Sequence, residues 1–249
     1  MKIYYIPSKM LKIVLATCFL IFLFLIGFAF IKNQGLFLAS RINSPHYQGQ
    51  SGQKLVSLTF NVDWGEEYLP SLFKILKDND IKATFFLTGR WAKAHPDLAK
   101  EIIKNGHEIG NHGQAHRHVK NLSIGEIENE ISAGETSILN ATGQRVSLYA
   151  PAFGEFDKEV GEAAANLNKE IIMWSLDTID WQNPSASIIV NRVVPRIHND
   201  AIVLMHPTRS TLEALPEIIG SLKKEGYRFD TVSNIIKSDK HGSKGKDTL

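Results

Sequence analysis

An uninterrupted apolar segment lies near the N-terminus of the chain. No charged residue occurs from Ile13 to Ile31. At about 1.5 Å per residue, a helix of that length spans a hydrocarbon core of roughly 30 Å. The segment is longer than the apolar part of an ordinary signal peptide, and no small-x-small cleavage site follows it directly. It predicts a transmembrane signal anchor over 13–31, with a cleaved signal peptide and a buried core helix as the alternatives.

The residues around this segment indicate its orientation. Three lysines precede it and Lys32 follows it, so the positive-inside rule places residues 1–12 in the cytoplasm. The rest of the chain is then expected on the extracytoplasmic side of the cell membrane. Residues 32–52 are polar and rich in turn formers and predict a stalk, and residues 238–249 predict a polar tail.

Residues 53–237 contain short apolar segments, typical of strands, that alternate with segments of helical periodicity. Strands separated by helices of about ten residues indicate a parallel sheet, and their number favours a distorted (β/α)7–8 barrel. In such barrels, reactive residues gather at the carboxyl ends of the strands. The expected strands are 55–60, 83–87, 107–111, 148–150, 171–176, 201–205 and 227–229, and the expected helices are 66–79, 96–104, 123–140, one from 157, 185–198 and 211–225.

Charge and cysteine content exclude several classes of protein. The chain has 28 Lys+Arg and 26 Asp+Glu, but residues 1–40 hold four lysines and no acid, which leaves 24 basic and 26 acidic residues elsewhere. The body is therefore slightly acidic and has no basic tract with interleaved aromatics, so we expect no nucleic-acid partner. The chain has one cysteine, Cys18, which lies in the apolar segment. A single cysteine excludes a disulfide framework and a cysteine-based zinc site.

Polar residues follow five of the predicted strands directly, as a barrel active site requires. His112 and His116 are four positions apart, which places two imidazoles on one face of a helical turn. Asp63, after a neighbouring strand, is the natural third ligand. Two imidazoles and one carboxylate suit a divalent metal, zinc first, with cobalt, nickel or iron as alternatives.

A further histidine follows the apolar strand 201–205. His206 is the candidate general acid, because an imidazole can donate a proton near neutral pH. Either Asp180 or Asp177 could orient it, and the other could cap the following turn. The four tryptophans, Trp64, Trp91, Trp174 and Trp181, are expected mostly in the core, and Trp181, beside Asp180, is the best candidate for stacking on a sugar ring.

Five ordered motifs resemble the polysaccharide deacetylase (NodB homology) family, carbohydrate esterase family 4. The resemblance covers about residues 53–236. It rests on Thr59-Phe60-Asn61-Val62-Asp63, on His112-x-x-x-His116 preceded by GHEIGNH, on Tyr149-Ala150-Pro151-Ala152-Phe153-Gly154, on Asp177-x-x-Asp180-Trp181 and on Leu204-Met205-His206.

Two positions depart from the family pattern. Asn61 stands where the family has its general-base Asp, and Ala150 stands where it has the paired Arg. The two changes are physically coherent, since either charged partner alone would be uncompensated. The metal Asp is displaced by one position, so that Asp63 follows Val62.

The resemblance implies a metal-dependent hydrolase that removes N-acetyl groups from amino sugars. Asp63, His112 and His116 would bind the metal. Either Asp63 would also serve as base or the metal would lower the pKa of its bound water enough without a base. His206 would protonate the leaving amine while Asp180 orients it. The substrate would be peptidoglycan, or else a chitin-like N-acetylglucosamine polymer. A catalytically weak or inactive glycan-binding protein is the alternative, and a purely structural membrane protein would leave the strand-end residues unexplained. The substrate contacts implied are Asn61, Phe153, Trp181 and Leu204.

Overall fold

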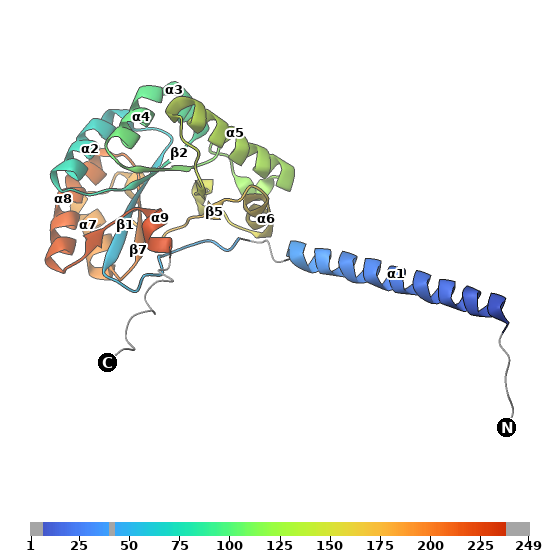
Figure 1. The fold of residues 1–249 in the computed structure, drawn as a ribbon. Coiled ribbons are helices and arrows are strands. Elements are labelled where there is room, and N and C mark those ends of the chain that lie inside the picture. Colours follow the sequence, from blue (N-terminus) through green and yellow to red (C-terminus); the bar gives the residue numbers. More distant parts are fainter. Residues whose placement is uncertain (1–6, 40–42, 238–249) are drawn as a thin grey trace, which may run out of the picture. The chain divides into compact units, whose positions relative to one another are not determined.

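The computed structural model describes residues 7–39 and 43–237, and the chain divides into two compact units, 1–42 and 43–249. The predicted tail 238–249 lies outside the described residues. Each unit has its own architecture (Figure 1). The first contains one helix and the second contains the sheet and all other described helices.

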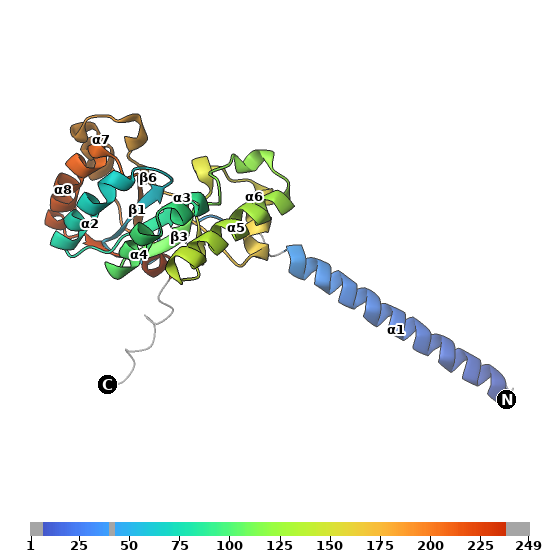
Figure 2. The same ribbon diagram turned by 90° about the horizontal axis from the view of Figure 1, so that it is seen from above.

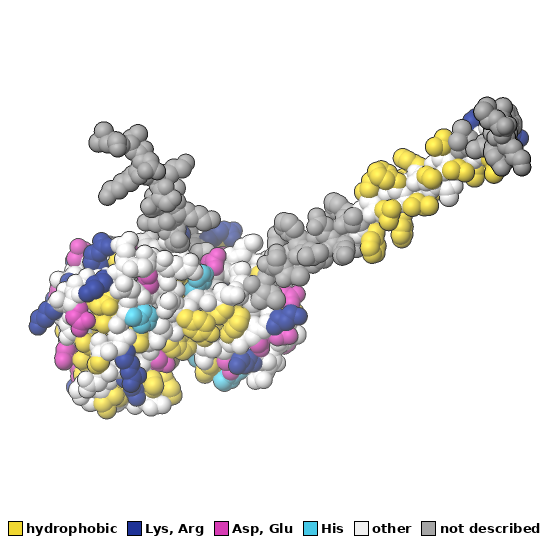
Figure 3. Space-filling view, turned by 90° about the horizontal axis from the view of Figure 1, so that it is seen from below, with side chains coloured by type: hydrophobic (Ala, Val, Ile, Leu, Met, Phe, Trp, Pro, Cys, Tyr) yellow, Lys and Arg dark blue, Asp and Glu magenta, His cyan; other side chains and the backbone are white. Residues whose placement is uncertain are grey.

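Helix α1 (Ser8–Ala39) carries the apolar segment. Its span Ser8–Phe28 is long and apolar enough to cross a membrane, and none of that span is buried within the chain. Apolar side chains gather along it in the space-filling view (Figure 3). The span thus has the length and composition of a membrane anchor or a signal sequence. The helix also extends to Ala39, into the predicted stalk.

The second unit is built on a parallel sheet that curls without closing. The strand order is β5-β4-β3-β2-β1-β7-β6, and β8 pairs with β1. Among the described residues, no ladder joins β5 to β6, so the predicted distorted barrel is a curled, open sheet. The strands are β1 (Leu55–Val62), β2 (Thr84–Leu87), β3 (Glu108–Asn111), β4 (Leu148–Tyr149), β5 (Glu170–Ile171), β6 (Leu176–Asp177), β7 (Ala201–Met205) and β8 (Arg228–Phe229).

Most helices lie along the outer side of this sheet (Figures 1 and 2). Ser123 and Glu126 form a capping box at the start of α5, in which each side chain bonds to the backbone of the other. Pro96 begins α4, where its missing N–H costs nothing. The helices are α2 (Leu69–Asp78), α3 (Gly89–Ala94), α4 (Pro96–Lys104), α5 (Ile124–Thr142), α6 (Lys158–Asn166), α7 (Ala186–Val193), α8 (Arg209–Lys224) and α9 (Val232–Ile236).

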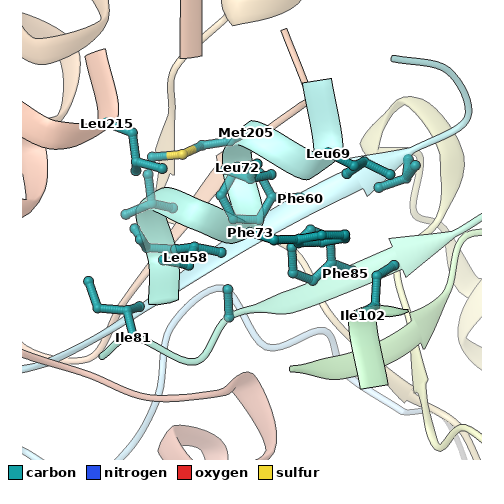
Figure 4. Close-up of a cluster of buried hydrophobic side chains, with 14 of the residues drawn as sticks. Leu58, Phe60, Leu69, Leu72, Phe73, Ile81, Phe85, Ile102, Met205 and Leu215 are labelled. Atoms are coloured by element: carbon teal, nitrogen blue, oxygen red, sulfur yellow. The ribbon is translucent and has the colours of Figure 1, made fainter. Parts of the chain in front are cut away.

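Strand alternation separates the core from the site. Leu58, Phe60 and Val62 of β1 pack under the outer helices, where Phe60 stacks on Phe85 at 5.0 Å between ring centroids (Figure 4). The intervening Thr59 and Asn61 point to the concave side, because successive side chains of a strand face opposite ways. A separate buried apolar cluster contains seven residues: Phe86, Leu148, Ala150, Ile172, Ile202, Val232 and Ile235.

Residues 43–52, predicted as part of a stalk, pack onto the second unit. The carbonyl of His46 accepts from the N–H of Met173 at 2.8 Å, and Gly49 N–H donates to the carbonyl of Asp200 at 2.8 Å. This segment thus bridges the region after β5 to the start of β7. The compact unit begins at Asn43, ten residues before the predicted domain boundary at 53.

This bridge gives a prediction at Gly49. A Cβ there would lie 2.5 Å from the Ile235 carbonyl oxygen, a backbone atom that cannot easily move. Gly49→Ala should lower the melting temperature, with a loss of about 1–3 kcal/mol in unfolding free energy. The matched control is Gly220→Ala in α8, where a Cβ meets nothing within 4 Å and should be neutral or stabilising. Thermal unfolding of both variants provides the measurement, and an unchanged Gly49→Ala melting temperature would contradict the packing.

A second prediction concerns the buried His107. Burial, helped by the nearby charge of Lys82, lowers the pKa of His107 to about 4. Because the unfolded chain binds the proton more tightly, this depressed pKa contributes stability above pH 6.5 that is lost as the pH falls toward 4. We expect a loss of about 2 kcal/mol from this residue between pH 6.5 and 4.5. Chemical unfolding of His107→Gln should show a correspondingly shallower pH dependence than the unaltered chain, and equal slopes would disprove this role.

Candidate active site

A cavity of about 460 Å³ opens at the carboxyl ends of the strands. Its size is typical of a small-molecule or cofactor site. Every site residue predicted from the sequence lines it except Asp180, which is fully buried. The lining comprises Asn61, Asp63, Trp64, His112, His116, Phe153, Gly154, Trp174, Asp177, Trp181, Leu204 and His206.

One wall holds His206 against a buried acid. Asp180 Oδ1 accepts from His206 Nδ1 at 2.7 Å, and Asp180 Oδ2 accepts from the backbone N–H of His206 at 2.6 Å and from the Thr211 hydroxyl. Of the two acids named from the sequence, Asp180 is the one that contacts His206, whereas Asp177 accepts from the N–H of Ile179 at 2.8 Å. With its Nδ1 hydrogen committed to Asp180, His206 presents its Nε2 edge to the cavity.

The two paired histidines line the same cavity. The rings of His112 and His116 lie 5.0 Å apart between centroids. His112 Nδ1 contacts the carbonyl oxygen of Ala150 at 2.7 Å. A carbonyl can only accept, so Nδ1 carries the hydrogen and the lone pair of Nε2 is free. Burial and the charge of His116 lower the pKa of His112 to about 3, against the opposing hydrogen bond to Ala150, so the ring is neutral near pH 7.

Asp63 is held by two donors next to the histidines. Its Oδ1 accepts from the Thr88 hydroxyl at 2.7 Å and from Arg90 Nε at 2.6 Å, and its Oδ2 pairs with Arg90 Nη2. Burial on its own raises the pKa of Asp63, but the hydrogen bonds from Arg90 and Thr88 outweigh it and hold the pKa below its usual range. Arg90 was not among the predicted site residues.

These donors meet the chemical requirements of a divalent metal only in part. His112 offers a neutral imidazole with a fixed tautomer, as a metal ligand needs. Asp63, however, faces Arg90, and within the described residues no three His, Cys, Asp or Glu side chains stand together as a metal-binding group. The assignment of Asp63, His112 and His116 as metal ligands stays a prediction.

Aromatic side chains form the rim. Phe153 and Trp181 are 54% and 52% exposed, as sugar-stacking residues would be. The assignment of Trp64 to the core was wrong, because it lines the cavity and is 44% exposed. Trp174 also lines the cavity but packs against a buried apolar cluster, in keeping with its core assignment. Trp64 lies parallel to the His206 ring at 6.1 Å between centroids. The turn that places it needs Gly65, where a Cβ would lie 2.2 Å from the Pro207 carbonyl oxygen.

The loop that carries the two histidines is supported from α5. Glu130 is buried, and its Oε1 accepts from the backbone N–H of Ala115 at 2.6 Å. The same loop is bonded to the start of α3, where the N–H of Gly89 donates to the carbonyl of Gly113 at 2.8 Å. Glu130 was missed by the sequence analysis, since it lies in the middle of an amphipathic helix, where an acid is usually solvated.

Comparison with known proteins identifies the family. Residues 48–172 match the family described as polysaccharide deacetylase. The chain belongs to this family of hydrolases, which confirms the resemblance seen in the five motifs. A peptidoglycan-N-acetylglucosamine deacetylase of Bacillus cereus is 33% identical over 193 residues, which cover 75% of this chain and 90% of that protein.

Two further relatives are more similar in sequence. The uncharacterised protein YlxY of Bacillus subtilis is 40% identical over 192 residues, which cover 77% of this chain but only 60% of YlxY. A crystal structure described as a pseudoenzyme of carbohydrate esterase family 4 from Bacillus anthracis superposes with a TM-score of 0.76 at 44% identity, covering 78% of this chain and 69% of that one. A mutant of that pseudoenzyme is described as having restored enzymatic activity.

The support from α5 gives a prediction at Glu130. Glu130→Ala removes the acceptor for the Ala115 N–H, and leaving such a group unpaired costs about 1–3 kcal/mol. The variant should therefore lose stability and show faster hydrogen exchange at the Ala115 amide. Glu130→Gln keeps a side-chain oxygen and should retain most of the protection. Equal exchange of that amide in all three proteins would contradict the role of Glu130.

Proposed function

We propose that the chain is a metal-dependent hydrolase that removes N-acetyl groups from amino sugars of a polysaccharide. The observation that carries this proposal is the hydrogen-bonded pair of His206 and Asp180 across one cavity from His112 and His116. A proton donor and a pair of neutral imidazoles facing one space are the groups that amide hydrolysis needs.

His206 is proposed to protonate the leaving amine. Asp180 holds its Nδ1, so that the Nε2 of the imidazolium can donate to the nitrogen of the breaking amide bond. Thr211 and the backbone N–H of His206 fix the orientation of Asp180 itself. The ring is thereby held at one angle to the cavity, which reduces the entropic cost of proton transfer.

His112 and His116 are proposed to bind a divalent metal, zinc first, with Asp63 as third ligand. When bound, such a metal would supply Lewis-acid polarisation of the acetyl carbonyl and a lowered pKa for attacking water. Asn61 cannot accept a proton as a carboxylate does, so the base role falls to Asp63. Since general-base help is worth roughly 100- to 10,000-fold, we expect a slow enzyme.

The aromatic rim supports a sugar substrate. Trp181 and Phe153 offer exposed faces on which a pyranose ring can stack, with Asn61 and Leu204 lining the cavity below. We propose peptidoglycan as the first substrate and a chitin-like polymer as the second. Use of α1 as a retained anchor, with the second unit outside the cytoplasmic membrane, would place the site beside the cell wall.

A second candidate function is glycan binding without hydrolysis. Two observations favour glycan binding. Asn61 replaces the family's base, and Arg90 is ion-paired with Asp63. The 44% identity to a protein described as a pseudoenzyme is in keeping with it. A binder would keep the aromatic rim and the cavity and would release no acetate.

Acetate release from N-acetylglucosamine oligomers and from peptidoglycan, with and without added zinc or cobalt, separates the two candidates. We expect slow, metal-stimulated release by the unaltered chain and faster release by Asn61→Asp, because a carboxylate at that position can take a proton from water. Binding of the oligomers with no acetate release in any condition would favour the binder.

Asp180→Asn tests the proton donor. An amide cannot accept all three of the hydrogens that Asp180 receives, so His206 would lose its fixed tautomer and orientation. We expect kcat to fall by about 100-fold or more with little change in KM. Asp97→Asn, on the exposed surface of α4, is the matched control and should behave as the unaltered chain. A change in KM with an unaltered kcat would argue against the orienting role of Asp180.

A further inference from the structure

Arg90 is the one full positive charge in direct contact with an acid of the cavity, among the described residues. Two of its guanidinium nitrogens meet both oxygens of Asp63, with Nε at 2.6 Å from Oδ1. The Asp63 side chain is only 10% exposed, whereas that of Arg90 is 54% exposed. A two-pronged contact of this kind is the strong form of an arginine–carboxylate pair.

The backbone fixes Arg90 in this position. Its N–H donates to the carbonyl of Gln114 at 2.9 Å, and the neighbouring N–H of Gly89 donates to the carbonyl of Gly113 at 2.8 Å. Both acceptors lie in the loop between His112 and His116. Arg90 is therefore tied to the histidine loop by its backbone and to Asp63 by its side chain.

We propose that Arg90 competes with a divalent metal for Asp63 and so sets the metal affinity of this site low. This inference rests on the proposed use of His112, His116 and Asp63 as metal ligands. Thr88 and Arg90 donate three hydrogens to the two oxygens of Asp63, two to Oδ1 and one to Oδ2, which leaves one of about four acceptor positions for a further cation. The guanidinium also repels any divalent charge placed against the same carboxylate.

The alternative role for Arg90 is to support metal binding by orienting Asp63. A residue that hydrogen-bonds a metal ligand can orient it, and its removal then weakens metal binding. Here the partner of the ligand is itself a full cation aimed at the carboxylate, which favours competition over support. The two roles predict changes of opposite sign when Arg90 is removed.

The test measures metal affinity directly. Zinc binding to the metal-stripped full chain in detergent is followed by titration calorimetry, and cobalt binding is followed by its visible absorption, which reports ligand number and type. Arg90→Ala should bind both metals about 10- to 100-fold more tightly than the unaltered chain, the range by which partners of metal ligands change affinity. Arg90→Lys, which keeps the charge and loses the two-pronged geometry, should fall between them.

Two controls make the outcome decisive. Lys93→Ala removes one positive charge from an exposed position of the same helix, α3, and should leave the affinity unchanged. His112→Ala should abolish the high-affinity signal, which ties that signal to this site. Unchanged or weaker binding by Arg90→Ala, with His112 still required, would overturn the role of Arg90 and leave the proposed metal site standing. Absence of His112-dependent binding in every variant would overturn both.

Discussion

The buried carboxyl group of Asp180 is the constraint on which the site depends. It has no exposed surface and receives three hydrogens, from the backbone and ring of His206 and from Thr211. Burying such a group without partners would cost several kcal/mol. The end of β7, the start of α8 and the turn that carries Asp180 must therefore come together for the domain to fold, and the orientation of His206 follows from that requirement.

The two acids of the site stand in contrasting environments. Asp180 is surrounded by donors that orient one imidazole and leave its other edge free for chemistry. Asp63 is paired with a guanidinium, which stabilises its charge but engages the oxygens that a metal would need. The proposed proton donor is thus held in place by hydrogen bonds within the chain. The proposed metal ligands His112 and His116 have no such ion pair among the described residues, whereas Asp63 is paired with Arg90.

The sequence predicted the elements whose pattern is set locally. The strand Ala201–Met205 and the helix Pro96–Lys104 have the predicted bounds, because an apolar run and a proline start define them. The predicted strand 171–176 is instead two short strands, β5 and β6. Between them the backbone N–H of Met173 donates to His46 and that of Ser175 donates to Ile202. Such long-range pairing leaves no local signal, and the packing of residues 43–52 was missed for the same reason.

The sequence predicted which residues form the site but only some of the contacts between them. Strand-end positions and the family resemblance led to the histidines, the acids and the aromatic residues that meet at one cavity. Arg90 was missed, because it lies in the six-residue helix α3, too short for a periodic pattern. Trp64 was assigned to the core on composition alone, whereas the close approach of Gly65 to Pro207 turns it toward His206.

The proposed proton donor requires that Asp180 fix the hydrogen of His206 on Nδ1. Nitrogen-15 NMR of the histidine rings measures the position of that hydrogen. We expect His206 to carry its hydrogen on Nδ1 in the neutral form, with a strongly downfield proton signal that disappears in Asp180→Asn. A His206 ring that carries its hydrogen on Nε2, or that exchanges freely between the two tautomers, would contradict it.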